Sequence, residues 1–442
     1  MSFNCADITA IVLNYARLEN VKVIVKHLCS EPLRDTISHV IVWNNNVGLP
    51  LSVADFEATL PEGLLKVVNS LDNSYFQARF LACVEAPTHW CLVQDDDYLV
   101  SAEAIRALRA HTRLNQTADH QYPIHLLPPH EHLSTTIRTR ITDKYTASFA
   151  WLGHGTLLTK THARSFLNLL RTVSDNRDDV MKMADNFFAI LLNRRAEIWV
   201  DPGMHLEAGQ DRAFTVGVEG DERNWRYIKL AEEYLERITS RPETVPDDGF
   251  SLIPNDLSIN SELIIRAPVL APGRIGVWST NVPMLPSGTL EAGLAGGDLR
   301  STDRLRRDMM TDMDVEIYTR HNLAYIGDGS TSTIFRSPEG CQEGQWLRFD
   351  FLDGRPVSSI TFRWTVGSDF AREIQHICYE IFEGQNWVKW TPKEAEAVSE
   401  TSFMVRLEVD HPTSLIAARA IVGAGSRTRP AWAVVACLVE TA

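Results

Sequence analysis

The sequence has no long apolar stretch and no cysteine arrangement that would cross-link it or hold a metal. None of its runs approaches the roughly 18 apolar residues of a membrane-spanning helix, so a chain that is not membrane-spanning is expected. The 7 cysteines are scattered, odd in number and without a CxxC pair, which argues against a disulfide framework and against structural zinc. We therefore expect most of them to be buried thiols in a reducing compartment.

Positive charge and amino-terminal targeting features are also scarce. The 442 residues carry a net charge of −14, which argues against nucleic acid or an anionic membrane as the main partner. Ser2–Asp7 has no basic residue, and the apolar run Ile8–Leu13 is shorter than that of a secretory signal. These features predict a cytoplasmic protein, and the length predicts two or three domains.

An acidic triplet at the end of an apolar run is the most informative stretch of the chain. Trp90–Val100 reads WCLVQDDDYLV, in which a buried strand is expected to end at Asp95, Asp96 and Asp97. Adjacent carboxylates raise one another's pKa unless a cation neutralises them. Mg2+ and Mn2+ prefer such oxygen ligands and often share them with substrate phosphates. The stretch therefore predicts a metal–diphosphate site or, without any chemistry, a solvated acidic turn.

Two earlier apolar runs also end in polar residues. Ile8–Leu13 is followed by Asn14–Arg17, and Ile37–Trp43 is followed by Asn44–Asn46. Helical spacing between such runs predicts a strand–helix alternation, which forms a mostly parallel sheet with right-handed crossovers. Ligands of these sheets bind beyond the carboxyl ends of the strands. The polar ends and the acidic triplet are therefore expected to line one crevice.

A second acidic group precedes an apolar helix near the middle of the chain. Asp178, Asp179 and Asp185 lie in the run RDDVMKMADNFFAILL. A carboxylate at the amino end of a helix can take part in chemistry, or it can simply cap the helix. Both interpretations stay open for Asp185.

Histidines give two further candidate metal ligands or sites. His205 follows a short apolar run and is either a ligand from the far side of the crevice or an ordinary surface or core residue. His125, His130 and His132 could suggest zinc, but no regular spacing unites them, so a zinc site is not expected there.

The pattern changes beyond residue 240. The segment 241–273 is rich in proline and is expected to be a linker or a strap. From 274 to 442, short alternating runs separated by Gly- and Asp-rich turns predict an all-β sandwich or jelly roll. The expected division is an α/β domain at 1–240, a linker and a β-domain.

Several stretches together resemble the exostosin-like family of retaining α-glycosyltransferases, which have the GT-A nucleotide-sugar fold. The stretch LNYAR at 13–17 looks like that family's Thr-Tyr-Asn-Arg turn, and HVIVWNN at 39–45 resembles its Val-Val-Trp-Asn-Asn strand. Arg79 stands at the family's spacing ahead of the triplet, and Asp95–Asp97 resembles an Asp-Asp-Asp variant of its DXD metal motif. The stretch 150–160 is similar to its Gly-containing strand near the acceptor.

The resemblance implies a UDP- or GDP-linked sugar donor and a divalent metal, Mn2+ or Mg2+. Asp97 would bind the metal, with His205 as the further candidate ligand. The catalytic carboxylate matches Asp185 better than Asp179, because the apolar helix starts directly after Asp185. The residues implied to hold the nucleotide and its phosphates are Tyr15, Arg17, Asn44, Asn45, Arg79, Asp95 and Asp96.

The expected activity is that of a metal-dependent hexosyltransferase. It would move a hexose or an N-acetylhexosamine to a hydroxyl of a glycan, glycolipid or small-molecule acceptor, with retention of configuration. Two alternatives stay open: an inverting transferase of the same fold that uses Asp185 or Asp179 as general base, and a non-catalytic carbohydrate-binding protein.

The later part of the chain resembles a different kind of domain. Asp328–Phe351 is similar to the discoidin-like, coagulation factor type C jelly roll, with its Asp-Gly-Ser-Thr turn and Trp-Leu-x-Phe-Asp-Phe strand. Domains of that kind bind glycans or other polar ligands, or only pack against a neighbour, and both roles are kept here.

Overall fold

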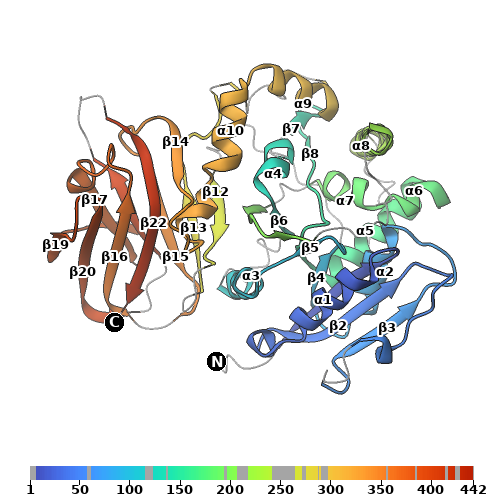
Figure 1. The fold of residues 1–442 in the computed structure, drawn as a ribbon. Coiled ribbons are helices and arrows are strands. Elements are labelled where there is room, and N and C mark those ends of the chain that lie inside the picture. Colours follow the sequence, from blue (N-terminus) through green and yellow to red (C-terminus); the bar gives the residue numbers. More distant parts are fainter. Residues whose placement is uncertain are drawn as a thin grey trace.

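A computed structural model of the chain describes most of its length. The residues described are 6–56, 61–114, 123–135, 138–193, 197–206, 218–240, 264–270, 275–286, 288–289, 297–354, 357–383, 386–413, 417–423 and 429–441. Figure 1 shows an α/β part, drawn in blue and green, and a β-rich part, drawn in orange and red.

Four parallel strands form the first half of the sheet in the α/β part, in the order β3-β2-β1-β4. Asn14 pairs with Asn44, and Asn44 with Asn69, so these strands end at the same level. The predicted strands and their polar ends are therefore present, and the ends lie along one edge. The strands are β1 (Ile8–Asn14), β2 (Ile37–Asn44), β3 (Leu65–Asn69) and β4 (Trp90–Gln94).

Among the described strands of the α/β part, the sheet is mostly parallel, as predicted, with β9 as the exception. β9 runs antiparallel to both of its neighbours, β4 and β6, while β6 and β10 are parallel to each other. β9 therefore enters the sheet from the opposite direction and brings the loop at 153–155 to the edge where β4 ends. The strands concerned are β6 (Ile124–Leu127), β9 (Thr156–Thr159) and β10 (Glu197–Val200).

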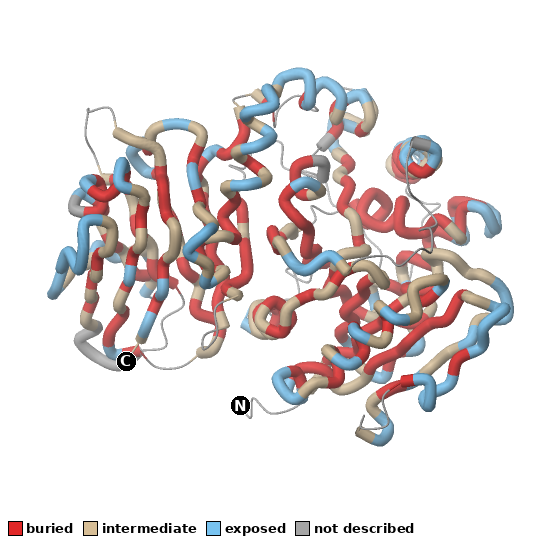
Figure 2. The backbone as a smooth tube through the Cα atoms, viewed as in Figure 1, coloured by how far each residue is buried: buried red, intermediate tan, exposed pale blue. Residues whose placement is uncertain are grey.

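Helices cover both faces of the sheet because its strands are apolar on both sides. Figure 2 shows most of this sheet as buried. Ile11 and Val93 face one core, with Phe80, Phe166 and Phe188 of α2, α5 and α7. The alternate residues of the same strands face a second core, against α1 and α3. The helices are α1 (Leu18–Leu28), α2 (Gln77–Glu85), α3 (Ala102–Leu114), α5 (Lys160–Val173), α6 (Asp178–Lys182), α7 (Asp185–Leu191) and α8 (Val218–Ser240).

The sheet continues into the β-rich part without a break. β12 lies within the segment expected to be a linker, and it joins β10 through the pair Trp199 and Arg266. β12 then pairs antiparallel with β13, from which the order continues β15-β21-β17-β18. Residues 241–263 of the expected linker lie outside the described residues. The strands are β12 (Ile265–Pro268), β13 (Gly276–Thr280), β15 (Trp346–Phe351), β17 (Ile377–Glu383), β18 (Asn386–Trp390) and β21 (Ala417–Val422).

A second sheet of 5 strands, in the order β14-β22-β16-β20-β19, packs on this extension to form a sandwich. Its alternating burial places Phe362, Trp364 and Trp432 in the core, where the Trp364 indole donates a 3.0 Å hydrogen bond to the Tyr379 hydroxyl. The predicted β-sandwich is present in this coarse sense. The strands are β14 (Phe335–Gly340), β16 (Val357–Val366), β19 (Glu394–Ala397), β20 (Ser402–Thr413) and β22 (Ala431–Thr441).

Two helices within 274–442 were not expected in an all-β domain. They follow one another at the top of Figure 1, where α10 packs beside α4 and α9 beside α8 and β7. Thr311 caps the second of them with a capping box to Asp314, a signal that the sequence does carry. These helices are α9 (Leu299–Asp308) and α10 (Asp312–Arg320), and α4 is Pro129–Thr135.

Short elements complete the description. No helix among the described residues is both long enough and apolar enough to cross a bilayer. The short strands are β5 (Tyr98–Leu99), β7 (Arg138–Arg140), β8 (Thr146–Ser148) and β11 (Met204–His205), and the single turns of 3-10 helix are Glu31–Leu33, Val53–Asp55, Leu323–Ile326 and Ile374–His376.

Candidate functional site

The acidic triplet leaves β4 next to the polar end of β1. The two strands pair in parallel, so the loop after β1 reaches across to the carboxylates. Arg17 donates from Nη1 to Asp96 Oδ1 at 2.8 Å and to Asp97 Oδ2 at 2.9 Å. The Arg17 side chain is 10% exposed and that of Asp97 is 35% exposed. One guanidinium therefore orients two carboxylates, and Asp97 is the one that faces solvent most.

Arg79 binds the remaining carboxylate of the triplet. It projects from α2, and its Nη2 lies 2.9 Å from Asp95 Oδ1 while the side chain is 2% exposed. Its Nε and Nη1 are buried and make no hydrogen bond with the part of the chain that the structure describes. A guanidinium keeps its charge at any relevant pH, so unused N–H groups in this position suit an anionic ligand.

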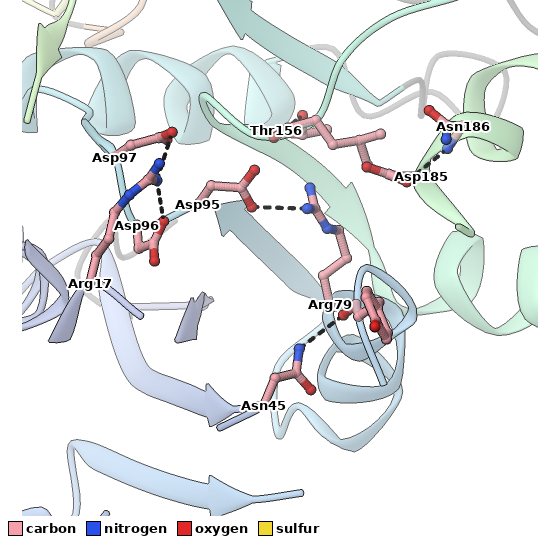
Figure 3. A network of polar contacts seen from close by, with 11 residues as sticks. Arg17, Asn45, Arg79, Asp95, Asp96, Asp97, Thr156, Asp185 and Asn186 are labelled. Atoms are coloured by element: carbon pink, nitrogen blue, oxygen red, sulfur yellow. Dashed lines mark hydrogen bonds and ion pairs between the residues drawn. The ribbon is translucent and has the colours of Figure 1, made fainter. Parts of the chain in front are cut away.

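Asp185 lies on the other side of Arg79 from Asp95, as Figure 3 shows. It is the first residue of α7 and is 8% exposed. Burial raises the pKa of Asp185 to about 7, against the opposing effect of Arg79, and the charge of Asp95 adds to the rise. The adjacent Asn186 is buried, and neither atom of its side-chain amide has a hydrogen-bond partner within the described ranges. This end of the site therefore holds unused polar groups.

Asp179 does not join this cluster. Its side chain is half exposed on α6, where it makes a 2.7 Å ion pair with Arg177. The hydrogen bond from Arg177 lowers the pKa of Asp179. Of the two carboxylates predicted as alternatives for the catalytic role, only Asp185 lies beside Arg79.

The two asparagines after β2 support the loops around the site. Asn44 Oδ1 accepts from Asn14 Nδ2 and from the Asn46 amide, and its Nδ2 donates to Leu49 O and Asn69 Oδ1. These bonds use the full hydrogen-bonding capacity of the Asn44 side chain, which gives it a structural role at this edge, and the nucleotide contact expected of Asn44 stays a prediction.

Asn45 is buried and hydrogen-bonded within the chain, whereas Tyr15 is exposed. Asn45 donates to Tyr75 O at 3.0 Å and accepts from the Ser74 amide, so it fixes the turn that precedes α2 and hence Arg79. Tyr75 has a φ of 46°, a left-handed conformation that a non-glycine residue needs such contacts to hold. The Tyr15 side chain is 48% exposed at the end of β1.

His205 lies close to the triplet along the backbone. Its strand, β11, pairs antiparallel with β5, which places His205 opposite Tyr98, and the Leu206 amide donates to Asp97 O at 2.8 Å. His205 is exposed. The structure therefore brings its backbone to the triplet. Of the other histidines, His125 on β6 hydrogen-bonds to Trp151 O and to the Thr156 hydroxyl, and His132 contacts Tyr318.

A buried group that sequence reasoning did not single out lies next to the triplet. His154 Nε2 is 2.8 Å from Glu131 Oε1, and its ring meets the ring of Tyr98 edge-on. Burial lowers the pKa of His154, but the hydrogen bond and charge of Glu131 outweigh this effect and raise it above its usual value. Tyr98 follows the triplet directly and donates to Pro202 O at 2.6 Å. Glu131 carries no sequence signal, because only the antiparallel β9 brings it near His154.

Position 153 has to be glycine because Asp95 lies too close to leave room for a side chain. A Cβ on Gly153 would lie 2.3 Å from Asp95 Oδ2, and the Asp95 amide donates to Gly153 O at 2.7 Å. Any larger residue would push the carboxylate out of its position beside Arg79.

Gly153→Ala is therefore expected to slow any reaction that depends on Asp95 by about 10- to 100-fold, the usual effect of disturbing the groups that orient a site. The check is a steady-state rate measured beside Gly48→Ala, whose Cβ would meet only Asn46 Oδ1 at 3.4 Å. Equal rates for the two variants would mean that the position of Asp95 is unimportant.

The donor set can be tested against the divalent metal that the sequence suggested. No three His, Cys, Asp or Glu side chains in the described segments converge to hold a metal ion by themselves. The edge does carry an excess of negative charge, with Asp95, Asp96, Asp97 and Asp185 around two arginines. Burial raises the pKa of Asp96 to about 6. Oxygen ligands in this number fit Mg2+ or Mn2+ bound by one or two carboxylates together with substrate phosphates.

Comparison with known proteins adds similarities of fold only. Neither a protein-family model nor a curated protein sequence matches the chain. A mannosyltransferase from Pyrobaculum calidifontis, solved with GDP-Man and Mn2+, is 15% identical, covers 54% of this chain and 76% of its own, and has a TM-score of 0.31. GalNAc-T7, solved with UDP, GalNAc and Mn2+, is 11% identical over 56% of this chain and 53% of its own, also at a TM-score of 0.31.

Carbohydrate-binding modules are similar to a smaller part of the chain. A chitosan-binding module of a Paenibacillus sp. IK-5 chitosanase/glucanase is 13% identical, covers 27% of this chain and 86% of its own, and has a TM-score of 0.20. At these TM-scores none of the similarities defines what this chain does, which has to follow from its own side chains.

Proposed function

We propose that the chain is a metal-dependent glycosyltransferase that uses a UDP- or GDP-linked sugar, with its active site at the carboxyl edge of β1 and β4. One observation carries the proposal: Arg17 and Arg79 hold the carboxylates of Asp95, Asp96 and Asp97 around a single edge. There, Arg79 keeps buried N–H groups that no described residue uses. A diphosphate and a divalent cation together satisfy both the unused donors and the excess negative charge.

Each residue has a stated part in this proposal. Asp97, the most exposed carboxylate of the triplet, would bind the metal, with His205 as an adjacent candidate ligand. Arg79 Nη1 and Nε would donate to phosphate oxygens, and Tyr15 at the open end of β1 would contact the nucleoside. The bound Mn2+ or Mg2+ would supply further charge neutralisation for the diphosphate as it leaves.

Asp185 is proposed as the carboxylate that acts at the sugar. A carboxylate beside the anomeric carbon stabilises positive charge as the diphosphate departs. In a retaining reaction the acceptor hydroxyl arrives on the face that the diphosphate leaves, so no protein base is required. The neighbouring Asn186 amide offers a donor and an acceptor for sugar hydroxyls.

The inverting alternative has one observation in its favour. A pKa of about 7 for Asp185 is the value at which a carboxylate works well as a general base near neutral pH. An inverting enzyme would use it to take the proton of the acceptor hydroxyl. Retention is kept as the first proposal because the sequence resemblance implies it.

A donor-hydrolysis screen tests the proposed function directly. We expect at least one member of a panel of UDP- and GDP-sugars to be hydrolysed in the presence of Mn2+, and the rate to fall to background with EDTA. Proton NMR of the product then gives the anomeric configuration and separates retention from inversion. No turnover and no calorimetric binding of any panel member would leave the carbohydrate-binding alternative, with the β-sandwich as its carrier.

A further inference from the structure

Arg306 is a buried cation without a counter-ion among the described residues. It lies on α9 and is 2% exposed, and its Nε, Nη1 and Nη2 atoms all lack a hydrogen-bond partner among the residues that the structure describes. By contrast, the guanidinium of Arg79, which is equally buried, is paired with the carboxylate of Asp95. An unpaired buried charge is strongly destabilising, because the protein interior does not replace the water that it loses.

The nearest acid on the same helix is already occupied. Asp303 lies one turn before Arg306, but its Oδ2 accepts a 2.9 Å bond from Arg307 Nε. Asp303 affects the pKa of Arg306 only through its charge, and burial is the larger effect, so the pKa of Arg306 is lowered. No carboxylate of the described residues forms an ion pair with the Arg306 guanidinium.

Polar side chains from two other helices lie close enough to Arg306 for charge to act between them. Tyr318 of α10 and His132 of α4 are both buried, hydrogen-bond to each other and stack at a ring distance of 5.8 Å. Burial lowers the pKa of His132 to about 3, and the charge of Arg306 contributes. His132 is therefore neutral, and Arg306 is the charged group of this cluster. In Figure 1, α9 leads into α10, and α10 lies beside α4.

We propose that Arg306, Tyr318 and His132 form a binding site for a small oxyanion, a carboxylate or a phosphate group. The planar fork of N–H groups on a guanidinium matches two oxygens of such a group, and a hydroxyl and a neutral imidazole beside it add polar contacts. The site is separate from the edge at Asp95–Asp97 and does not depend on the proposed transferase activity. Its occupant supplies the negative charge that the described residues around Arg306 do not provide.

Thermal unfolding with and without an added anion tests the site. Without added phosphate, and with chloride as the only anion, Arg306→Met is expected to unfold at a temperature a few degrees above wild type, because it removes a buried unpaired charge. Inorganic phosphate or acetate, at constant ionic strength, is expected to raise the wild-type midpoint by about 2 °C at ten times its dissociation constant. This rise should be lost in Arg306→Met.

Two further variants separate this site from other anion sites. Arg304→Met makes the same substitution at an exposed position of α9 and should keep the full response to anions. Arg79→Met removes the arginine proposed to hold the diphosphate and should also keep the part of the response that depends on Arg306. Equal anion responses in wild type and Arg306→Met, or no response of wild type to either anion, would overturn the proposal. Calorimetry with phosphate on wild type and Arg306→Lys gives a second readout, in which the lysine variant should bind at least tenfold more weakly.

Discussion

Replacement of Asp97 by alanine is expected to abolish donor turnover, with a loss of about 10³-fold or more, and to remove the dependence of the rate on Mn2+. The carboxylate of Asp97 is the most exposed of the triplet, and only one of its oxygens is bound to Arg17. Its loss would leave the Arg17–Asp96 pair in place, so the fold should survive. The measurement is the rate of donor hydrolysis across a Mn2+ titration.

Asp178→Ala is the matched control for this experiment. Asp178 is also an aspartate in an ion pair, with Lys182 at 2.7 Å, but its side chain is 78% exposed and lies on α6. It should keep the wild-type rate and metal response. Hydrolysis by Asp97→Ala at the wild-type rate in Mn2+ would refute a metal site on the triplet.

Asp185→Asn is the second substitution with a large expected effect. It keeps the size of the side chain but removes the charge beside Arg79, so kcat is expected to fall by about 10²- to 10³-fold while the dissociation constant of the donor changes little. A kcat that is unchanged here but falls in Asp179→Asn would transfer the role to Asp179, which the ion pair with Arg177 otherwise makes an unsuitable candidate.

The same substitution is expected to increase stability at alkaline pH. The pKa of Asp185 is about 7 in the folded chain and about 3.8 in the unfolded chain, so the folded state binds more protons between these values. The free energy of unfolding therefore falls as pH rises from about 4 to about 7, by at most about 4 kcal/mol from this group. Asp185→Asn removes that dependence, so its midpoint should exceed that of wild type at pH 8 and approach it at pH 4.

The pH dependence of the wild-type kcat is expected to reflect the same ionisation of Asp185. Because the ionised form of Asp185 is required in either mechanism, kcat should rise with pH through a value near 7 and level off above it. The chain would thus lose stability and gain activity over the same pH range. A flat profile between pH 5 and 8 would mean that Asp185 ionises outside this range or takes no part.

The position of the candidate site could be predicted from sequence because it depends on where one strand, β4, ends. The abrupt change from Cys91–Val93 to three aspartates marks both the end of β4 and the acidic edge, and the polar end of β1 falls beside it because parallel neighbours share an edge. The preference for Asp185 over Asp179 also followed from the start of the apolar helix α7. Each of these inferences starts from a change between apolar and polar residues that are close together in the chain.

Features that depend on long-range pairing were not accessible in this way. The reversed direction of β9, which brings His154 to Glu131, leaves no mark on the periodicity of Thr156–Thr159. The saturation of Asn44 depends on Asn14 and Asn69, which lie on different strands. Helices α9 and α10 were overlooked because their surroundings are β-rich, although the Thr311 cap is readable. In the first two cases the deciding contacts join residues far apart in sequence.

Because one sheet runs from β3 to β18, neither the α/β part nor the β-rich part has a free edge strand where β10 meets β12. One flank of β10 is taken by β6 and the other by β12, whose far flank is taken by β13. Pulled apart, both halves would expose bare backbone amides and carbonyls of the kind that recruit strands from other molecules. Each half thus shields the other from self-association, a benefit of their union that would persist even if the β-sandwich touched no sugar.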